Sequence, residues 1–162
     1  MKLTRLAAAA ALVAASSSGF AITLTPLGDL TRGTAAFANT PIAGTFTDTL
    51  SFTLTTASFL TGTVTSVVSG TQDVDFTSIS VTGAGGPYAF TQIATDPFET
   101  WARSSVQLAA GTYTLTLMGS NSASIGSYAG TLGVTPVPEA GTLAMMLAGL
   151  GMVGFMARRR QA

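Results

Sequence analysis

Two aspartates separated by one residue, Asp73 and Asp75, are the side chains in this sequence best placed to do chemistry together. Side chains two apart on a β-strand point to the same face, so both carboxylates would lie on one side of a strand. With further carboxylates from Asp96, Glu99 or Asp48 they would suit Ca²⁺, which takes about six to eight oxygen ligands. The alternative is that both residues begin a strand after a turn and are solvated. No EF-hand spacing is present, so the sequence predicts no cofactor and leaves Asp73 and Asp75 as calcium candidates.

Residue types argue against catalysis. The chain has no histidine and no cysteine, which removes the commonest general base and the thiolate nucleophile. Hydroxyl groups are abundant, but the one lysine, Lys2, lies at the start of the chain and cannot serve a Ser-x-x-Lys pair. A pair of carboxylates would fit a glycosidase by residue type. The domain is small, however, and shows no long loops that would form a lid, so we expect no enzyme.

Trp101 and Asp48 each have two interpretations. Trp101 could stack on a sugar ring, or it could anchor a loop beside Phe98. Asp48 is in phase with apolar neighbours, and a buried carboxylate without a partner is costly. We therefore expect Asp48 to lie near a sheet rim or to pair with Arg32 or Arg103.

Charge is scarce and unevenly placed. Only 9% of the 162 residues are charged, against about a quarter in typical soluble domains. Between residues 22 and 135 there are two arginines and six acidic residues, which gives this middle region a net charge of −4. A mildly acidic region without lysine has no electrostatic surface for nucleic acid or for an anionic membrane.

The clearest secondary-structure signal is the alternation over Thr45–Thr55. Apolar residues and Asp48 occupy one phase, and threonine or serine occupies the other. This is the pattern of a half-buried strand with hydroxyl groups facing solvent. The residues expected to point inward are Phe46, Asp48, Leu50, Phe52 and Leu54.

A second strand shows a break in phase. Val74 and Phe76 share one phase, whereas Ile79 and Val81 share the other. A bulge near residues 77–78 would return all four side chains to one buried face.

Residues 22–135 as a whole predict one all-β domain. About eight short β-type runs are separated by Gly, Pro, Asn and Asp, with irregular segments expected at 30–44 and 119–126. The pattern favours an antiparallel β-sandwich, jelly-roll-like in topology. No convincing helix lies within this region.

The amino-terminal segment, residues 1–21, predicts a secretory signal peptide. Lys2 and Arg5 form its positive start, Leu6–Ala15 is apolar, and small residues precede a cut after Ala21. The middle domain is then exported.

The carboxyl-terminal segment, residues 136–162, has three parts. A box, Val137-Pro138-Glu139-Ala140, precedes the uncharged run 142–157, and the cluster Arg158, Arg159 and Arg160 follows. We expect a transmembrane helix over 142–157, with the arginines as a stop that remains inside. Sixteen residues span about 24 Å, less than the ~30 Å hydrocarbon core. The alternative is a core helix of a soluble domain.

This tail resembles the PEP-CTERM sorting signal of Gram-negative bacteria. Ala140 stands where that family's box has its second proline. The resemblance implies that an exosortase cuts near the box, with the tail as its substrate. The segment from Phe46 to Phe52 resembles the FxDxF subgroup, with Leu50 in place of its second Phe, and it is also similar to bacterial pre-peptidase C-terminal modules.

Together these features suggest an exported, exosortase-processed protein of the cell surface or extracellular matrix, with a single-pass membrane precursor. We expect a structural or adhesive role associated with exopolysaccharide or biofilm. The alternative is a carbohydrate- or calcium-binding β-sandwich module. A third possibility is that the C-terminal helix is retained as an anchor.

Overall fold

The computed structural model describes residues 26–31, 33–70, 73–138 and 140–159. The predicted signal peptide over 1–21 lies outside these ranges, as do Arg32, Glu139 and Arg160. The described residues form eight strands and one helix: β1 (Gly28–Asp29), β2 (Gly33–Leu54), β3 (Ser58–Val67), β4 (Val74–Gly83), β5 (Gly86–Ala89), β6 (Thr91–Ala94), β7 (Phe98–Leu108), β8 (Gly111–Pro136) and α1 (Ala140–Arg159).

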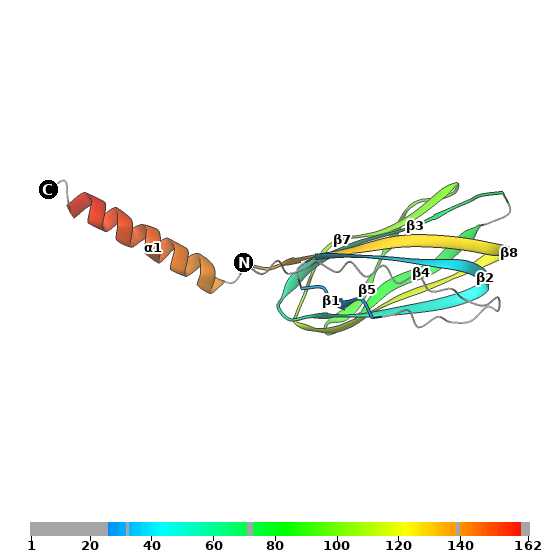
Figure 1. The fold of residues 1–162 in the computed structure, drawn as a ribbon, viewed down its shortest axis with the longest axis horizontal. Coiled ribbons are helices and arrows are strands. Elements are labelled where there is room, and N and C mark those ends of the chain that lie inside the picture. The colour runs from blue at the N-terminus through cyan, green and yellow to red at the C-terminus, as the bar shows by residue number, and fades with distance from the viewer. Residues whose placement is uncertain (1–25, 32, 71–72, 139, 160–162) are drawn as a thin grey trace, which may run out of the picture.

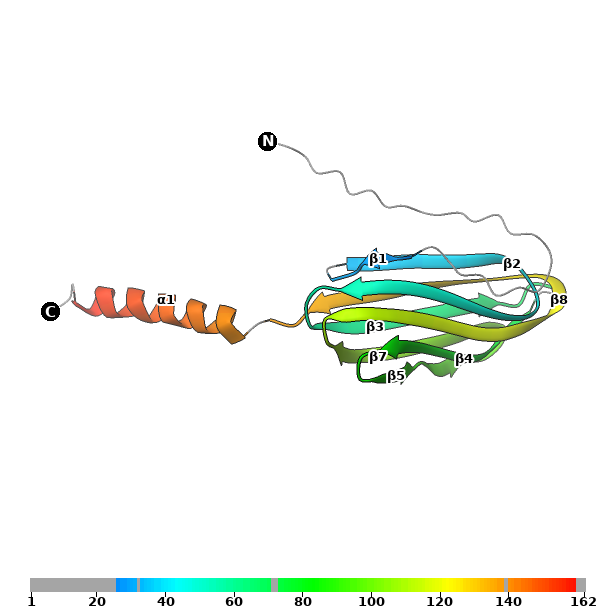
Figure 2. The ribbon, with the colours of Figure 1, turned by 90° about the horizontal axis from the view of Figure 1, so that it is seen from below.

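The fold is built on one long antiparallel ribbon made by β2 and β8. Their pairing runs from Gly33 opposite Val134 to Leu54 opposite Gly111, with register shifts between Asn39 and Gly44. At these shifts the ribbon turns back on itself, so that the two halves of β2 lie in different layers (Figure 2). The bend allows two strands to take part in both sides of the domain.

The remaining strands extend each half of this ribbon. The half formed by the end of β2 and the start of β8 pairs with β1 and β4, and β5 pairs with β4. The other half is extended by β3, β7 and β6 in that order. Only Phe90 separates β5 from β6, so this segment passes from one layer to the other. The result is a nearly closed, barrel-like sheet (Figure 1).

The alternation over Thr45–Thr55 is confirmed, because its inward-facing residues are all buried. They are Phe46, Asp48, Leu50, Phe52 and Leu54. The bulge near residues 77–78 is also confirmed, since the register of β4 against β8 shifts between Phe76 and Ser78. Val74, Phe76, Ile79 and Val81 consequently all face the core.

An aromatic cluster fills the bent end of the core. Tyr128 stacks on Phe46 at a centroid separation of 5.9 Å and meets Phe76 edge-on at 5.4 Å. Phe37 lies against the same ring at 6.5 Å. Gly130 makes room for this packing, because a Cβ there would overlap the Phe37 ring.

Two of the predicted irregular segments are strands. Residues 33–44 belong to β2, and residues 119–126 belong to β8. Residues 33–39 pair with residues 128–134 of β8, whereas residues 119–126 pair with residues 42–46 of β2 and with the start of β4. The Asn121 side-chain amide also donates a 2.7 Å hydrogen bond to the Ile42 carbonyl. Neither segment shows its pairing in its own sequence. The all-β antiparallel class is confirmed, and its two layers join into one nearly closed sheet.

The prediction of a transmembrane helix over 142–157 is corrected. The segment is helical, as part of α1, and lies off the sheet body in both views (Figures 1 and 2). Among the described residues, however, no helix combines the length and the apolar character that crossing a membrane requires. Its uncharged run is short for a ~30 Å hydrocarbon core, and it includes Gly149, Gly151 and Gly154.

Candidate functional site

Three carboxylates meet at one end of the barrel. Asp73 directly precedes β4, Asp75 is its second residue, and Asp96 lies in the β6–β7 connection. Carboxylate oxygens of the three residues lie within 4.8 Å of one another. The sequence leaves Asp73 and Asp75 as calcium candidates, together with Asp96, Glu99 or Asp48, or as solvated residues at the start of a strand. Of the three further carboxylates, the structure brings that of Asp96 close to them. Asp75 and Asp96 are exposed, whereas Asp73 is half-buried.

Within this acidic cluster, the carboxylate of Asp73 is the one whose negative charge is least well compensated. Its Oδ1 atom is buried and accepts no hydrogen bond from the described residues, while its backbone N–H donates to Asn121 Oδ1 at 3.4 Å. Burial raises the pKa of the Asp73 carboxyl above its ordinary value, and the negative charges of Asp75 and Asp96 raise it further. An unpaired oxygen beside two like charges is an arrangement that a cation would relieve.

Asp48 lies elsewhere, fully buried inside the bent ribbon. Its Oδ2 atom accepts hydrogen bonds from Asn39 Nδ2 at 2.7 Å and from the Tyr128 hydroxyl at 2.6 Å. Burial, followed by the charge of Asp48, raises the pKa of the Tyr128 hydroxyl, so tyrosine remains the donor. The expectation that Asp48 lies at a sheet rim is wrong, because Asp48 is fully buried. Pairing with Arg103 is also not observed, since Arg103 donates to the Ala89 carbonyl at 3.0 Å, whereas the other expected partner, Arg32, lies outside the described residues.

Glu99 is a second buried carboxylate, and its position was not predicted. Its Oε1 atom accepts from Gln92 Nε2 and Trp101 Nε1, both at 2.8 Å. Its Oε2 atom accepts from the Phe76 backbone N–H at 3.1 Å and from Ser66 Oγ at 3.3 Å. Four donors hold this side chain away from the acidic cluster. The bond to Trp101 supports the interpretation of Trp101 as a structural anchor.

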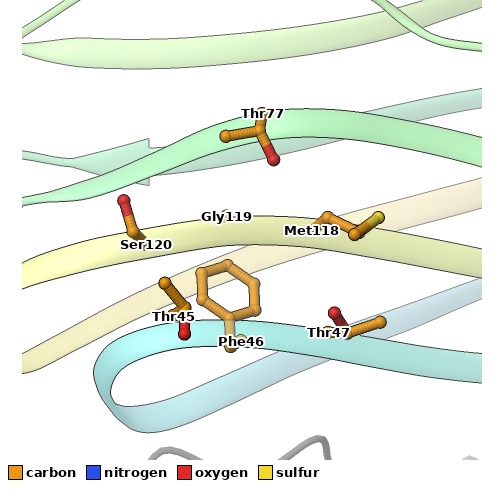
Figure 3. A pocket seen from close by; sticks show the side chains of 7 residues that line it. All are labelled: Thr45, Phe46, Thr47, Thr77, Met118, Gly119 and Ser120. Atoms are coloured by element: carbon orange, nitrogen blue, oxygen red, sulfur yellow. The ribbon is translucent and has the colours of Figure 1, made fainter.

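A groove of about 350 Å³ lies where β2, β4 and β8 meet (Figure 3). Its lining residues are Thr45, Phe46, Thr47, Thr77, Met118, Gly119 and Ser120. Hydroxyl groups, one thioether and one aromatic ring surround it, and no lining side chain is charged. The groove can offer hydrogen bonds to a neutral polar group, but it has no acid or base for catalysis.

The carboxyl-terminal box begins directly on the sheet. Pro136, the last residue of β8, lies opposite Ser58 of β3, and the Val137 N–H donates a 2.9 Å hydrogen bond to the Ala57 carbonyl. Pro138 is exposed, and α1 begins at Ala140. The box thus starts at the edge of the folded domain with Val137, and its last residue, Ala140, is the first residue of the helix.

The arginines of the tail lie at the far end of that helix. Arg158 and Arg159 occupy the last turn of α1, and both are exposed. Cations in this position favourably face the negative end of the helix dipole. Box, apolar helix and terminal arginines therefore follow one another without interruption.

Residues 136–160 match the family model of the PEP-CTERM protein-sorting motif. The match covers the box, the helix and the arginine cluster together. The PEP-CTERM motif supports export of this protein and processing by an exosortase. The placement of the motif in the structure adds that its first residues are hydrogen-bonded to the β domain.

The chain is similar to two solved structures at low identity. One is the pre-peptidase C-terminal domain of a collagenase from Bacillus anthracis, at 13% identity and a TM-score of 0.44, covering 70% of this chain and 97% of that one. The other is PliG of Aeromonas hydrophila, a periplasmic inhibitor of g-type lysozyme, at 12% identity and a TM-score of 0.41, covering 72% and 100%. Likenesses this distant say nothing about activity. No curated protein matches the chain.

Proposed function

We propose that this chain is a bacterial cell-surface or extracellular-matrix protein that an exosortase processes, and that its β domain has a structural or adhesive role beside exopolysaccharide. The observation that carries the proposal is the PEP-CTERM motif at residues 136–160, immediately after the last strand of a folded domain. In this proposal the tail is the substrate of the processing enzyme. Membership of the FxDxF-type subgroup is part of the proposal.

The outer surface of the domain fits such a role. On the face formed by β2, β8 and β4, Thr49 lies opposite Thr116, and Thr116 lies opposite Ser80. The next outward position repeats the pattern with Ser51, Thr114 and Thr82. Rows of hydroxyl groups without charge can exchange hydrogen bonds with a neutral, hydrated polymer.

The interior supports a non-enzymatic role. The carboxylate of Glu99 is occupied by four donors, and Asp48 is held by Asn39 and Tyr128. Groups satisfied in this way stabilise a fold rather than exchange protons with a substrate. The chain contains no histidine or cysteine to take their place.

Processing is the test of this function. The full chain is expressed in a bacterium that contains an exosortase, and the C-terminus of the protein recovered from surface or medium is determined by mass spectrometry. We expect a product that ends near the box, and an uncut precursor when Arg158, Arg159 and Arg160 are all replaced by alanine. Recovery of mature protein that still ends at Ala162 would refute the proposal.

Calcium binding is a second candidate, favoured by the unpaired Oδ1 atom of Asp73 within the acidic cluster. Calorimetric titration of the exported protein with Ca²⁺ tests it, with Asp73→Asn as the variant and Asp29→Asn as the control outside the cluster. Binding that Asp73→Asn abolishes and Asp29→Asn leaves intact would support a calcium site. Absence of heat with the unmodified protein would exclude it at the concentrations used.

A further inference from the structure

We propose that the folded β domain restrains its own sorting box, so that the end of β8 must detach from β3 before an exosortase can cut. The inference rests on the proposed function and adds to it a mode of regulation. Processing would then depend on how firmly the last residues of β8 are held, and the domain would set the rate of its own release.

The restraint consists of contacts on one side of β8. Thr135 pairs with Phe59 and Pro136 pairs with Ser58, and the Val137 N–H extends the ladder to the Ala57 carbonyl. The pairing with β2 has already ended, at Gly33 opposite Val134. Among the residues that the structure describes, the last ones before the box therefore pair only with β3.

Little chain separates this attachment from the helix. Val137, Pro138 and Glu139 are the residues between β8 and α1. Fully extended residues span about 3.3–3.6 Å each, so three residues reach only about 10 Å. An enzyme that encloses the box would meet the sheet body within that distance.

Enzymes that bind peptides in extended form use the backbone N–H and C=O groups of the bound segment. The Val137 N–H already donates to Ala57, so it is not available to an enzyme while the strand end is paired. Cleavage of a restrained segment follows the population of its open form when opening and closing are fast. Release of the strand end thus precedes recognition.

This opening requires only local unfolding. A strand end held by a few backbone hydrogen bonds opens far more often than the whole domain unfolds. Variants that weaken the pairing of the end of β8 with β3 should speed processing, and variants that strengthen it should slow processing.

The first test frees the box without altering it. Gly-Ser-Gly-Ser is inserted between Pro136 and Val137 of the full chain, and processing is followed by pulse-chase labelling in an exosortase-containing bacterium. We expect the precursor half-life to fall several-fold. The same insertion between Gly85 and Gly86, in the exposed turn before β5, is the control and should leave the half-life unchanged.

The second test locks the strand end. Phe59→Cys with Thr135→Cys places two thiols at paired positions next to the box, while Thr63→Cys with Thr131→Cys places them at paired positions farther along the same strands. We expect the first pair to slow processing several-fold until a reductant is added, and the second pair to have no effect.

The outcomes separate the two levels of the proposal. Wild-type rates for both the Pro136–Val137 insertion and the oxidised Phe59–Thr135 pair would overturn the restraint while the sorting function stands. A wild-type precursor that is never cut would remove the sorting function and the restraint with it.

Discussion

The Tyr128 hydroxyl donates a 2.6 Å hydrogen bond to Asp48 Oδ2, although the two residues are 80 positions apart in the chain. The bond crosses the bent β2–β8 ribbon inside the core, where Asp48 is fully buried. It joins the two halves of the ribbon, since Asp48 lies in the second half of β2 and Tyr128 in the second half of β8. A buried carboxylate is costly unless donors surround it, so this pair is one place where the fold is specified by polar contacts.

Tyr128→Phe should destabilise the domain by about 1–3 kcal/mol, because it leaves a buried carboxylate with one donor fewer. The measurement is the free energy of unfolding in urea. Tyr88→Phe is the matched control, since the Tyr88 hydroxyl donates to the Ala84 carbonyl at an exposed site. Equal decreases in the free energy of unfolding for the two variants would show that the hydrogen bond to Asp48 stabilises the domain no more than an exposed one does.

Glu99→Gln should cost about 1.5–3 kcal/mol, because an amide N–H₂ would face donors that now surround a carboxylate. Trp101 is the single tryptophan of the chain, so its fluorescence reports on this site directly. We expect its emission to shift to longer wavelength, because a neutral amide oxygen accepts more weakly than the carboxylate and the loosened ring gains contact with water. Gln107→Ala, at an exposed position of the same strand, should leave stability within about 0.5 kcal/mol and emission unchanged. An unaltered spectrum in Glu99→Gln would contradict the structural role of the bond.

Asp73→Asn should flatten the pH dependence of stability. The pKa of Asp73 is raised in the folded protein, so its contribution is fully present below the ordinary value of 3.8 and is lost as pH rises through the raised pKa. The variant should therefore be more stable than the wild type at pH 7, by less than about 1 kcal/mol because partly exposed charges are screened. Thermal unfolding from pH 3 to 7 provides the comparison.

Asp29→Asn is the control of opposite sign. Hydrogen bonds from Thr31 lower the pKa of Asp29, so its contribution is present above the ordinary value of 3.8 and is lost as pH falls. At pH 7 the variant should therefore be less stable than the wild type, and this difference should disappear as the pH falls to 3. If both variants change the pH profile in the same direction, the assignment of these two sites is wrong.

Gly130→Ala should destabilise the domain by about 1–3 kcal/mol, because a Cβ would overlap the Phe37 ring and approach the Thr63 carbonyl. Chemical denaturation measures the loss. Gly149→Ala in α1 is the control, since a Cβ there meets nothing within 4 Å. If the denaturant concentration at the midpoint of unfolding is the same for Gly130→Ala as for the wild type, the aromatic cluster can shift to accept a methyl group.

Much of the fold could be predicted from local pattern. A period of two over Thr45–Thr55 identified the buried face, and the change of phase between Phe76 and Ile79 identified the bulge. The bend of the ribbon could not be found in this way. Residues 39–44 become strand because residues 121–128 lie opposite them, and such pairing has no signal in either segment alone.

For the candidate site as well, features that are local in the sequence could be predicted, whereas features that depend on strand pairing could not. The three parts of the tail are contiguous, so they could be read from the sequence, and two of the three clustered aspartates are neighbours on one strand. The contact between Val137 and Ala57 depends on the β3–β8 register, which the sequence does not show. Glu99 was assigned to a possible calcium site because it is acidic, but its phase with Trp101 could have placed it inside.

Because β8 is the last strand of the chain and lies at the centre of the sheet, the domain can complete its fold only after β8 is present. Every large β element either pairs with β8 or is joined to the sheet through a neighbour that does. A chain that is synthesised and delivered from its amino terminus therefore has no complete core until residue 136 has arrived, although β3, β7 and β6 can pair with one another earlier. Assembly is consequently ordered in time: the last strand completes the body, and the sorting motif emerges directly behind it.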